Sequence, residues 1–249
     1  MAPIHPPENI VSHFTELRKR LLIAAAAWVA ASIIAYPFSG WILDRLLEPL
    51  GSISPAVYFT APADAFMVRF RIALTAGVLI ASPVILGQLW MFVSPALYRK
   101  EKKIVLPLVL VISLFFVVGA LFAFFLVLPP TLQFLMGYET PRLKPLITIE
   151  EYASFAGGFV LAFGVAFNLP VAVALLSFAG LVRHAQLVAW RKYVVVFLFF
   201  AAAVLTPSPD VVSQLMLGVP LVLLYEIGVA CARLIEARKK RSAARREVQ

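Results

Sequence analysis

Two carboxylates in the amino-terminal half of the chain are the strongest candidates for binding chemistry. Glu16 stands in the basic segment before the first long apolar stretch, and Glu101 is the single acid in a loop rich in lysine and arginine. A carboxylate accepts two parallel hydrogen bonds from one guanidinium, so either residue can bind an arginine of another molecule. Plainer interpretations compete with this one. The i, i+4 spacing favours an exposed pair of Glu16 with Arg20, and Glu101 can equally offset the lysines beside it.

The sequence shows no residue set that could carry out catalysis. The three histidines, His5, His13 and His184, lie outside the long apolar stretches or at their edges, and Cys231 is the single cysteine. No H-E-x-x-H, G-x-S-x-G or P-loop pattern occurs. We therefore expect no enzyme activity, no cofactor and no metal site.

The elements that position these residues are predicted to be membrane-spanning helices. Of the 249 residues, 62% are hydrophobic and 14% are charged, whereas soluble domains are about 45–50% apolar and about 25% charged. A helix needs roughly 20 apolar residues to cross a bilayer. Stretches free of charge predict a single all-α integral membrane domain with six spans, at about 21–41, 67–91, 104–128, 153–178, 191–206 and 211–230.

The last two predicted spans are short, and residues 206–210 separate them with the sequence TPSPD. Two prolines and Asp210 favour a turn at this point over the interior of a helix. A five-span alternative would join both stretches into one helix with Asp210 at its centre, where a charge is unfavourable. Spans this short require a locally thinner bilayer or helix ends that the protein buries.

The distribution of lysine and arginine supports six spans. Seventeen of the 22 fall on the side that carries both chain ends, and the other side receives five: Arg45, Arg69, Arg71, Arg142 and Lys144. By the positive-inside rule, both termini are then cytoplasmic. The net charge of +9 follows from this topology, so no nucleic-acid partner is needed to explain it.

The two ends of the chain are predicted to lie outside the spans. Residues 1–20 form a cytoplasmic lead-in that becomes an amphipathic helix, with Phe14 and Leu21 on its apolar face and Glu16 turned away from that face toward the cytoplasm. Residues 234–249 form a basic cytoplasmic tail.

The outer side is predicted to carry two substantial loops, residues 42–66 and 129–152. Both are rich in proline and apolar residues, so we expect them to pack on the outer surface as caps. Pro129-Pro130 is predicted to end the third helix before its apolar stretch ends.

Polar residues inside the spans are few. Asn168 in the fourth span and Gln214 in the sixth are candidates for hydrogen bonds to another helix, each worth roughly 1 kcal/mol or less in a membrane. A structural role is the favoured interpretation of both. No inverted repeat is evident, which disfavours a secondary transporter of a small solute, the alternative function that we retain.

Five motifs, in order along the chain, resemble those of the TatC family, the polytopic receptor subunit of the twin-arginine protein translocase. They are His13-Phe14-x-Glu16-Leu17-Arg18-x-Arg20 before the first span, Glu48-Pro49-Leu50 in the first outer loop, Phe92-Val93-Ser94-Pro95-Ala96-Leu97-Tyr98-x-x-Glu101 after the second span, Phe163-Gly164-Val165-x-Phe167-x-x-Pro170 in the fourth span, and Thr206-Pro207-x-Pro209-Asp210-x-x-Ser213-Gln214 between the last two. The resemblance covers essentially the whole chain.

The resemblance implies a cupped six-helix receptor in the prokaryotic cytoplasmic membrane. It would recognise twin-arginine signal peptides of folded proteins at the cytoplasmic face and organise their export, driven by the proton-motive force. The residues that match the family's signal-recognition site are Glu16, Phe92, Pro95, Leu97 and Glu101.

Further sites and partners follow from the same resemblance. Pro49 and Asp210 match functional outer-loop positions, and the last two spans are expected to contact single-span subunits of the TatA type and, where present, the TatB type. We also expect contacts with the lipid bilayer and with further copies of the chain. One departure concerns the fourth span, where many family members carry a glutamate and this chain has Asn168, which cannot ionise.

Overall fold

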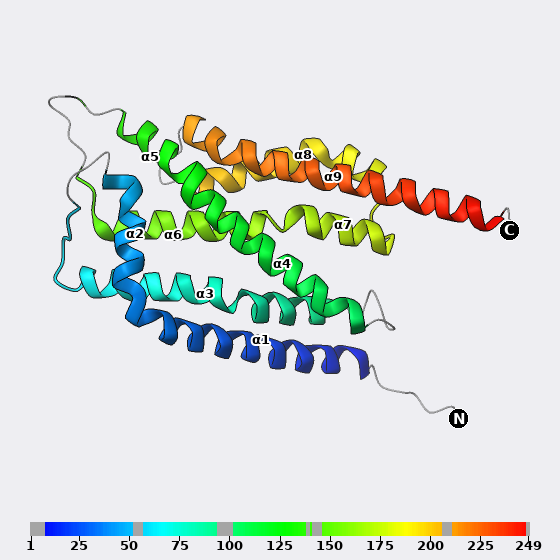
Figure 1. The fold of residues 1–249 in the computed structure, drawn as a ribbon, viewed down its shortest axis with the longest axis horizontal. Coiled ribbons are helices and arrows are strands. Elements are labelled where there is room, and N and C mark those ends of the chain that lie inside the picture. Colours follow the sequence, from blue (N-terminus) through cyan, green and yellow to red (C-terminus); the bar gives the residue numbers. More distant parts are fainter. Residues whose placement is uncertain are drawn as a thin grey trace.

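The computed structural model describes residues 8–51, 57–93, 102–137, 140, 146–205 and 211–247, and these residues are almost entirely helical. Figure 1 shows the helices running side by side along one direction, with shorter pieces crossing them at one end. In chain order the elements are α1 (Glu8–Ala35), η1 (Tyr36–Phe38), α2 (Ser39–Gly51), α3 (Asp64–Val93), α4 (Lys102–Phe122), η3 (Ala123–Val127), α5 (Leu128–Met136), α6 (Ile149–Ala166), α7 (Leu169–Ala179), α8 (His184–Leu205) and α9 (Val211–Glu247).

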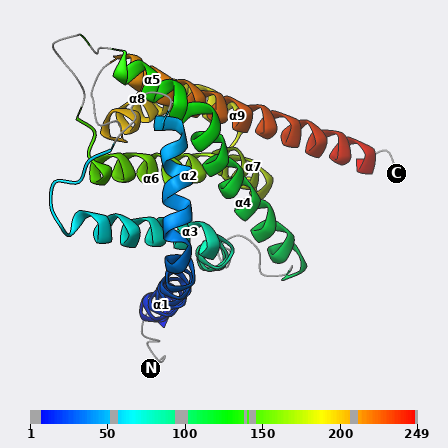
Figure 2. The ribbon, with the colours of Figure 1, turned by 60° about the vertical axis from the view of Figure 1, so that its left-hand side comes forward.

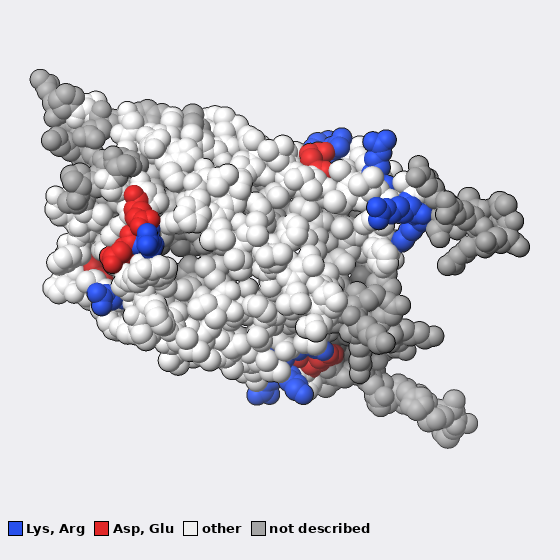
Figure 3. Space-filling model, in the orientation of Figure 1, with Lys and Arg blue, Asp and Glu red and all other residues white. Residues whose placement is uncertain are grey.

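Six segments of the described chain are long and apolar enough to cross a membrane, which confirms the six-span prediction. They are Phe14–Gly51, Asp64–Phe92, Leu106–Met136, Ile149–Ala179, His184–Val204 and Gln214–Lys239. Figure 3 shows charged side chains gathered at the two ends of the molecule, with an uncharged band between them. An uncharged band of this kind is what the hydrocarbon core of a bilayer requires.

The start of α1 and the end of α9 lie at the same end of the molecule (Figure 1), and Figure 2 shows the same helices turned by 60°. We call this end, which also holds the end of α3 and the α7–α8 turn, the basic end. The opposite end holds α2, the start of α3 and the start of α6, and we call it the cap end. An even number of spans is the arrangement that puts both chain ends on one side.

Helices α1 and α3 pack closely because a glycine removes the side chain from their interface. A Cβ atom at Gly77 would lie 2.9 Å from the Ser32 Cα, so this position accepts glycine alone at the observed spacing. The Trp28 indole donates to the Leu74 carbonyl at 2.9 Å, and small residues at helix contacts are typical of membrane proteins.

The core between α4 and α6 is aromatic. Phe159 and Phe163 are 1% and 0% exposed, and their ring centroids lie 5.2 Å apart. Gly119 of α4 admits this packing, because a Cβ there would lie 2.5 Å from the Phe163 carbonyl oxygen. Rings at this separation contribute beyond the area that they bury.

Helices α8 and α9 form an antiparallel hairpin, so the five-span alternative with one merged helix is wrong. The Tyr225 hydroxyl donates to the Leu187 carbonyl at 2.8 Å, and Arg191 pairs with Glu226 at 2.6 Å. On its other side, α9 packs on α7, where a Cβ at Gly228 would lie 3.2 Å from the Pro170 Cα.

The prediction that Pro129-Pro130 ends the third helix is wrong. The chain passes from α4 through a π-helical turn, η3, directly into α5, where the two prolines occupy the first turn. Proline is tolerated there because the first amides of a helix have no partner within that helix. The π turn joins α4 to α5 without ending the apolar segment.

The predicted outer loops contain more helix than expected. Residues 42–51 belong to α2 and residues 129–136 to α5, and Leu50 at the end of α2 is 1% exposed. What remains of the two loops meets in a short parallel bridge, in which Tyr58 N–H donates to the Ile147 carbonyl at 3.0 Å and Ile149 N–H donates to the Tyr58 carbonyl at 2.8 Å. The cap-like packing is thus present, although helix builds much of it.

The expected basic tail is part of a helix. Residues 234–247 continue α9 without a break, because no proline or glycine interrupts the sequence after Gly228.

Candidate functional site

The side of α1 that carries Glu16 faces the rest of the protein. Phe14 and Leu21 are 66% and 60% exposed, so the apolar face of this segment points away from the protein. Glu16 and Arg20 are half-buried, and they lie in register with Trp28 and Ser32, which face α3. Glu16 thus lies on the side of α1 away from Phe14 and Leu21, as the pattern predicts, and this side faces α3. In a membrane the apolar face meets lipid and the more polar face meets protein.

The Glu16 carboxylate is held by the side chain one turn later. Arg20 Nε donates to Glu16 Oε1 at 3.0 Å, and Arg20 Nη2 donates to the same oxygen. The Arg20 side chain is 20% exposed and that of Glu16 is 39% exposed. The local pair expected from the spacing thus forms. Both bonds end on Oε1, so Arg20 does not use the second oxygen, Oε2.

Glu16 lies level with the end of α3. Helices α1 and α3 run antiparallel, as Figure 1 shows, and Ser32 lies opposite Gly77. Glu16 is 16 residues before Ser32 on α1, and α3 ends 16 residues after Gly77. Because the two helices are antiparallel, Glu16 lies opposite the last turn of α3. That turn holds Phe92, which is partly buried. Two of the predicted recognition residues therefore share one level of the basic end.

The other three predicted recognition residues, Pro95, Leu97 and Glu101, lie outside the described residues, as does Asp210 in the outer turn. Pro95, Leu97 and Glu101 belong to the segment that connects α3, which ends at Val93, to α4, which begins at Lys102. In the described parts of the chain, no group of three or more His, Cys, Asp or Glu residues could hold a metal ion.

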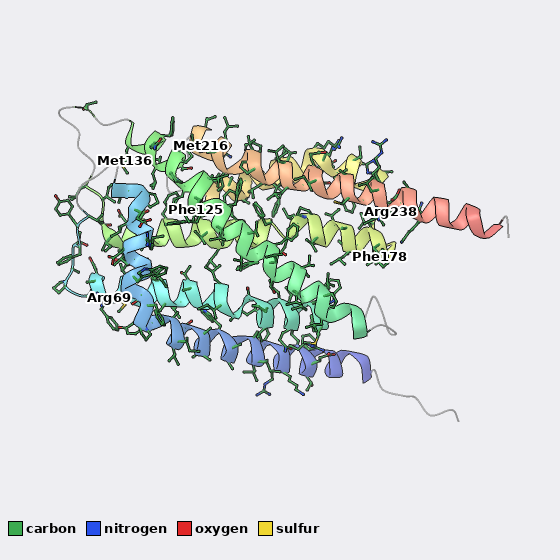
Figure 4. The ribbon with its side chains drawn as sticks, in the orientation of Figure 1. Arg69, Phe125, Met136, Phe178, Met216 and Arg238 are labelled. Carbon is green, nitrogen blue, oxygen red and sulfur yellow. The ribbon has the colours of Figure 1, made fainter. Side chains whose placement is uncertain are left out.

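A second polar cluster at the basic end joins α9 to the α7–α8 turn. His184 N–H donates to Glu236 Oε1 at 2.5 Å, and Lys239 Nζ donates to the Phe178 carbonyl at 2.5 Å. The ammonium also lies 5.3 Å from the centroid of the Phe178 ring, a residue labelled in Figure 4. A cation at the carboxyl end of α7 is favoured by the helix dipole. Sequence reasoning missed this cluster, because its members are about 50 to 60 positions apart.

Asn168 lies at a break in the fourth span, between α6 and α7. Its Nδ2 donates to the Gly164 carbonyl at 3.0 Å, while its backbone N–H donates to the Val165 carbonyl at 3.0 Å. The side chain thus replaces the bond that the shifted backbone no longer makes to Gly164. Its Oδ1 is buried and has no hydrogen-bond partner among the described residues.

Gln214 bonds within the chain, at the start of α9. Its Nε2 donates to the Phe199 carbonyl of α8 at 2.9 Å, so the side chain joins α8 to α9 near the cap end. Pro49, the predicted outer-loop residue, lies inside α2 and is half-buried beside Leu50. Both residues therefore contribute to the packing of the cap end.

One face of α8 remains uncovered along most of its length. Large apolar side chains at alternating spacings of three and four residues are 49–71% exposed. They are Trp190, Tyr193, Phe197, Phe200 and Val204. This spacing forms a single stripe on a helix, the pattern that packs against another helix.

Comparison with known sequences identifies what the chain resembles. Residues 12–220 match the family described as Sec-independent protein translocase protein (TatC). The TatC protein of Carboxydothermus hydrogenoformans is 40% identical over 233 residues, which cover 94% of this chain and 96% of that protein. The TatC protein of Aquifex aeolicus is 39% identical over 235 residues, which cover 93% of this chain and 97% of that protein.

Comparison with solved structures gives the same result. A crystal structure of the twin-arginine translocase receptor TatC superposes with a TM-score of 0.82 and 38% sequence identity, and the match covers 90% of this chain and 99% of the other. A second crystal structure of that receptor, in the detergent DDM, has a TM-score of 0.81 and 39% identity.

Proposed function

The chain belongs to the TatC family of Sec-independent protein translocase proteins, and from that premise we propose that its basic end is the cytoplasmic receptor surface for twin-arginine signal peptides. The protein is a core component of the twin-arginine translocase and a multi-pass protein of the bacterial inner membrane. It is a transport protein.

The observation that carries the proposal is the position of Glu16. It is a half-buried carboxylate level with the end of α3, and Arg20 engages one of its two oxygens. An incoming guanidinium can approach Oε2 while Arg20 keeps Oε1 in place. Partial burial strengthens such a charge-assisted bond relative to one made in open water.

We assign the second arginine of the signal peptide to Glu101. Glu101 directly precedes α4 in the sequence, and eight residues, 94 to 101, connect α3 to α4. Phe92, Pro95 and Leu97 would contact the apolar residues of the peptide. Two separate carboxylates can distinguish a pair of arginines from a single one.

The exposed stripe on α8 is the proposed contact for a single-span partner of the TatA or TatB type. Its side chains, from Trp190 to Val204, are apolar and uncovered, so a second transmembrane helix can pack along them. Gln214 and Asn168 both bond within the chain, so we assign them to holding the helices that present this stripe. Further copies of the chain and the proton-motive force complete the proposed export machinery.

The test is peptide binding to the purified protein in nanodiscs. We expect a twin-arginine signal peptide to bind about tenfold or more tightly than its twin-lysine version, because lysine keeps the charge but loses the bidentate geometry. Glu16→Ala and Glu101→Ala should each remove most of that preference. Glu151→Ala, which deletes an exposed carboxylate at the cap end, should leave it unchanged.

Equal binding of both peptides, unaffected by Glu16→Ala and Glu101→Ala in folded protein, would overturn the proposed site. A secondary transporter, the second function considered, predicts instead uptake of a small solute by proteoliposomes that hold this chain alone. The ionisable pair of Arg191 and Glu226 lies on α8 and α9. The other four spans have charge-free stretches, within residues 21–43, 72–98, 104–138 and 152–182, which disfavours that function.

A further inference from the structure

A cavity of about 310 Å³ lies beneath α2, between α3, α4 and α6. Its walls are almost wholly apolar and include Ile72, Leu79, Phe124 and Val160. Phe124 is held by the edge-on ring of Phe125, with 4.9 Å between the centroids, and Figure 4 labels Phe125 on η3. An apolar cavity of this kind does not bind water well, so it is suited to an apolar occupant.

The cavity opens at the surface beside charged side chains of α2. Figure 3 shows a hollow on this face next to the charged cluster of the cap end. Trp41 and Arg45 both line the cavity. The Arg45 guanidinium lies 5.6 Å from the Trp41 ring centroid and is paired with Glu48. These side chains are half-exposed or more, so the pair can open at little free energy.

If the uncharged band is taken as the hydrocarbon core, α2 lies at the edge of that band, where headgroups begin. In Figures 1 and 2 it crosses the spans roughly at right angles, at the cap end of the uncharged band. Tryptophan and arginine are typical of this depth. A molecule that enters the cavity from the bilayer would therefore have its polar end at Arg45 and its apolar part between α3, α4 and α6.

The cavity has a volume of about 310 Å³, and side chains of α2, α3, α4, η3 and α6 line it. An unbranched hydrocarbon chain is narrow enough to enter.

We propose that this cavity holds one acyl chain of a zwitterionic phospholipid with a primary ammonium headgroup, whose phosphate binds Arg45 and whose ammonium binds Glu48. The two charges of such a headgroup match the two charges of the open Arg45–Glu48 pair. A purely anionic headgroup would satisfy Arg45 but would bring its charge near the Glu48 carboxylate.

The experiment uses a phosphatidylethanolamine with a photoreactive diazirine in its acyl chain, added to the purified protein in nanodiscs. After illumination, mass spectrometry maps the labelled peptides. We expect labelling concentrated on cavity-lining residues such as Leu79, Ala120 and Val160. The matching phosphatidylglycerol should label these peptides several-fold less.

Two variants and one control test the site. Ala76→Phe places a ring in the cavity, because Ala76 lines it and is half-buried, and should reduce the labelling several-fold. Ala30→Phe makes the same substitution at an exposed alanine of α1 and should leave the labelling unchanged. Arg45→Gln alters only a half-exposed side chain and should remove the preference for phosphatidylethanolamine, even if Ala76→Phe fails to fold.

The proposal is overturned by equal labelling of the cavity peptides in wild type and folded Ala76→Phe. It is also overturned by labelling that is equal or stronger with phosphatidylglycerol, or by cavity peptides labelled no more than the exposed lipid-facing surface. Failure of these tests would leave the signal-peptide site untouched, because Arg45 and the cavity are at the opposite end of the molecule from Glu16.

Discussion

The cap end and the basic end are held together in different ways. At the cap end, hydrogen bonds join elements far apart in the sequence. The Tyr152 hydroxyl donates to the Leu46 carbonyl at 2.5 Å, across 106 positions, and Arg71 pairs with Glu150 at 3.3 Å, across 79 positions. These bonds tie α2, α3 and α6 to one another.

At the basic end, the bonds stay within smaller groups of elements. The Glu16–Arg20 pair lies within a single turn of α1, while Glu236 and Lys239 join α9 to the α7–α8 turn. Among the described residues, the amino-terminal and carboxyl-terminal halves thus have separate polar clusters at this end. The comparison indicates that the cap end sets the relative positions of the spans, while the basic end can adapt to a bound peptide.

Asp64→Ala should break the cap end most severely. The Asp64 Oδ2 accepts from Thr60 N–H at 2.7 Å, Thr60 Oγ1 at 3.0 Å and Ala61 N–H at 2.8 Å, and this turn leads into α3. Bonds to a charged acceptor are worth roughly twice neutral ones. We expect the largest fall in Tm of the three stability variants, measured in detergent, with partial recovery in Asp64→Asn. An unchanged Tm would contradict the ordering role assigned to this end.

Tyr152→Phe should have the next largest effect. The substitution deletes one hydroxyl, fills the same volume and leaves the Leu46 carbonyl without this donor. We expect a loss of about 1 kcal/mol in the free energy of unfolding, read from unfolding by a denaturing detergent. Phe155→Tyr, on the same helix, serves as a control, because it also changes one hydroxyl and keeps the aromatic ring. A loss of stability smaller than that of Arg20→Gln would contradict the conclusion that the cap end is held more firmly than the basic end.

Arg20→Gln should have the smallest effect on stability. The pair with Glu16 is local and partly exposed, and pairs one helical turn apart contribute about 0.3–0.5 kcal/mol. We expect Tm to change little. The affinity for a twin-arginine peptide should fall measurably, because Glu16 loses the donor that holds Oε1. A fall in Tm as large as that of Tyr152→Phe would show that the basic end is as firmly held as the cap end.

Charge-free stretches and the turn chemistry near Pro207 and Pro209 were sufficient to predict the number of spans, because a bilayer restricts length and charge strongly. The i, i+4 spacing likewise predicted the Glu16–Arg20 pair, a purely local contact. The sequence did not predict that the side of α1 with Glu16 faces another helix, because this depends on which side of α1 meets α3. That choice rests on the close approach at Gly77, which spacing within α1 does not reveal.

Other features depended on contacts between distant segments and could not be read from local patterns. Pro129-Pro130 is a strong stop signal by itself, yet the preceding π turn lets α5 begin at that point. The Trp41, Arg45 and Glu48 spacing is visible in the sequence as one face of a helix. The cavity beside it is not, because α3, α4 and α6 supply its other walls.

The length of α9 has a consequence for how the carboxyl terminus is presented. Its 37 residues, at 1.5 Å each, make a rod of about 55 Å, whereas the hydrocarbon core is about 30 Å thick. Since α9 begins at the cap end, the last turns of this rod stand clear of the lipid. A fluorescent protein or affinity tag fused after Gln249 would therefore be held by the projecting end of α9, at a distance from the bilayer surface.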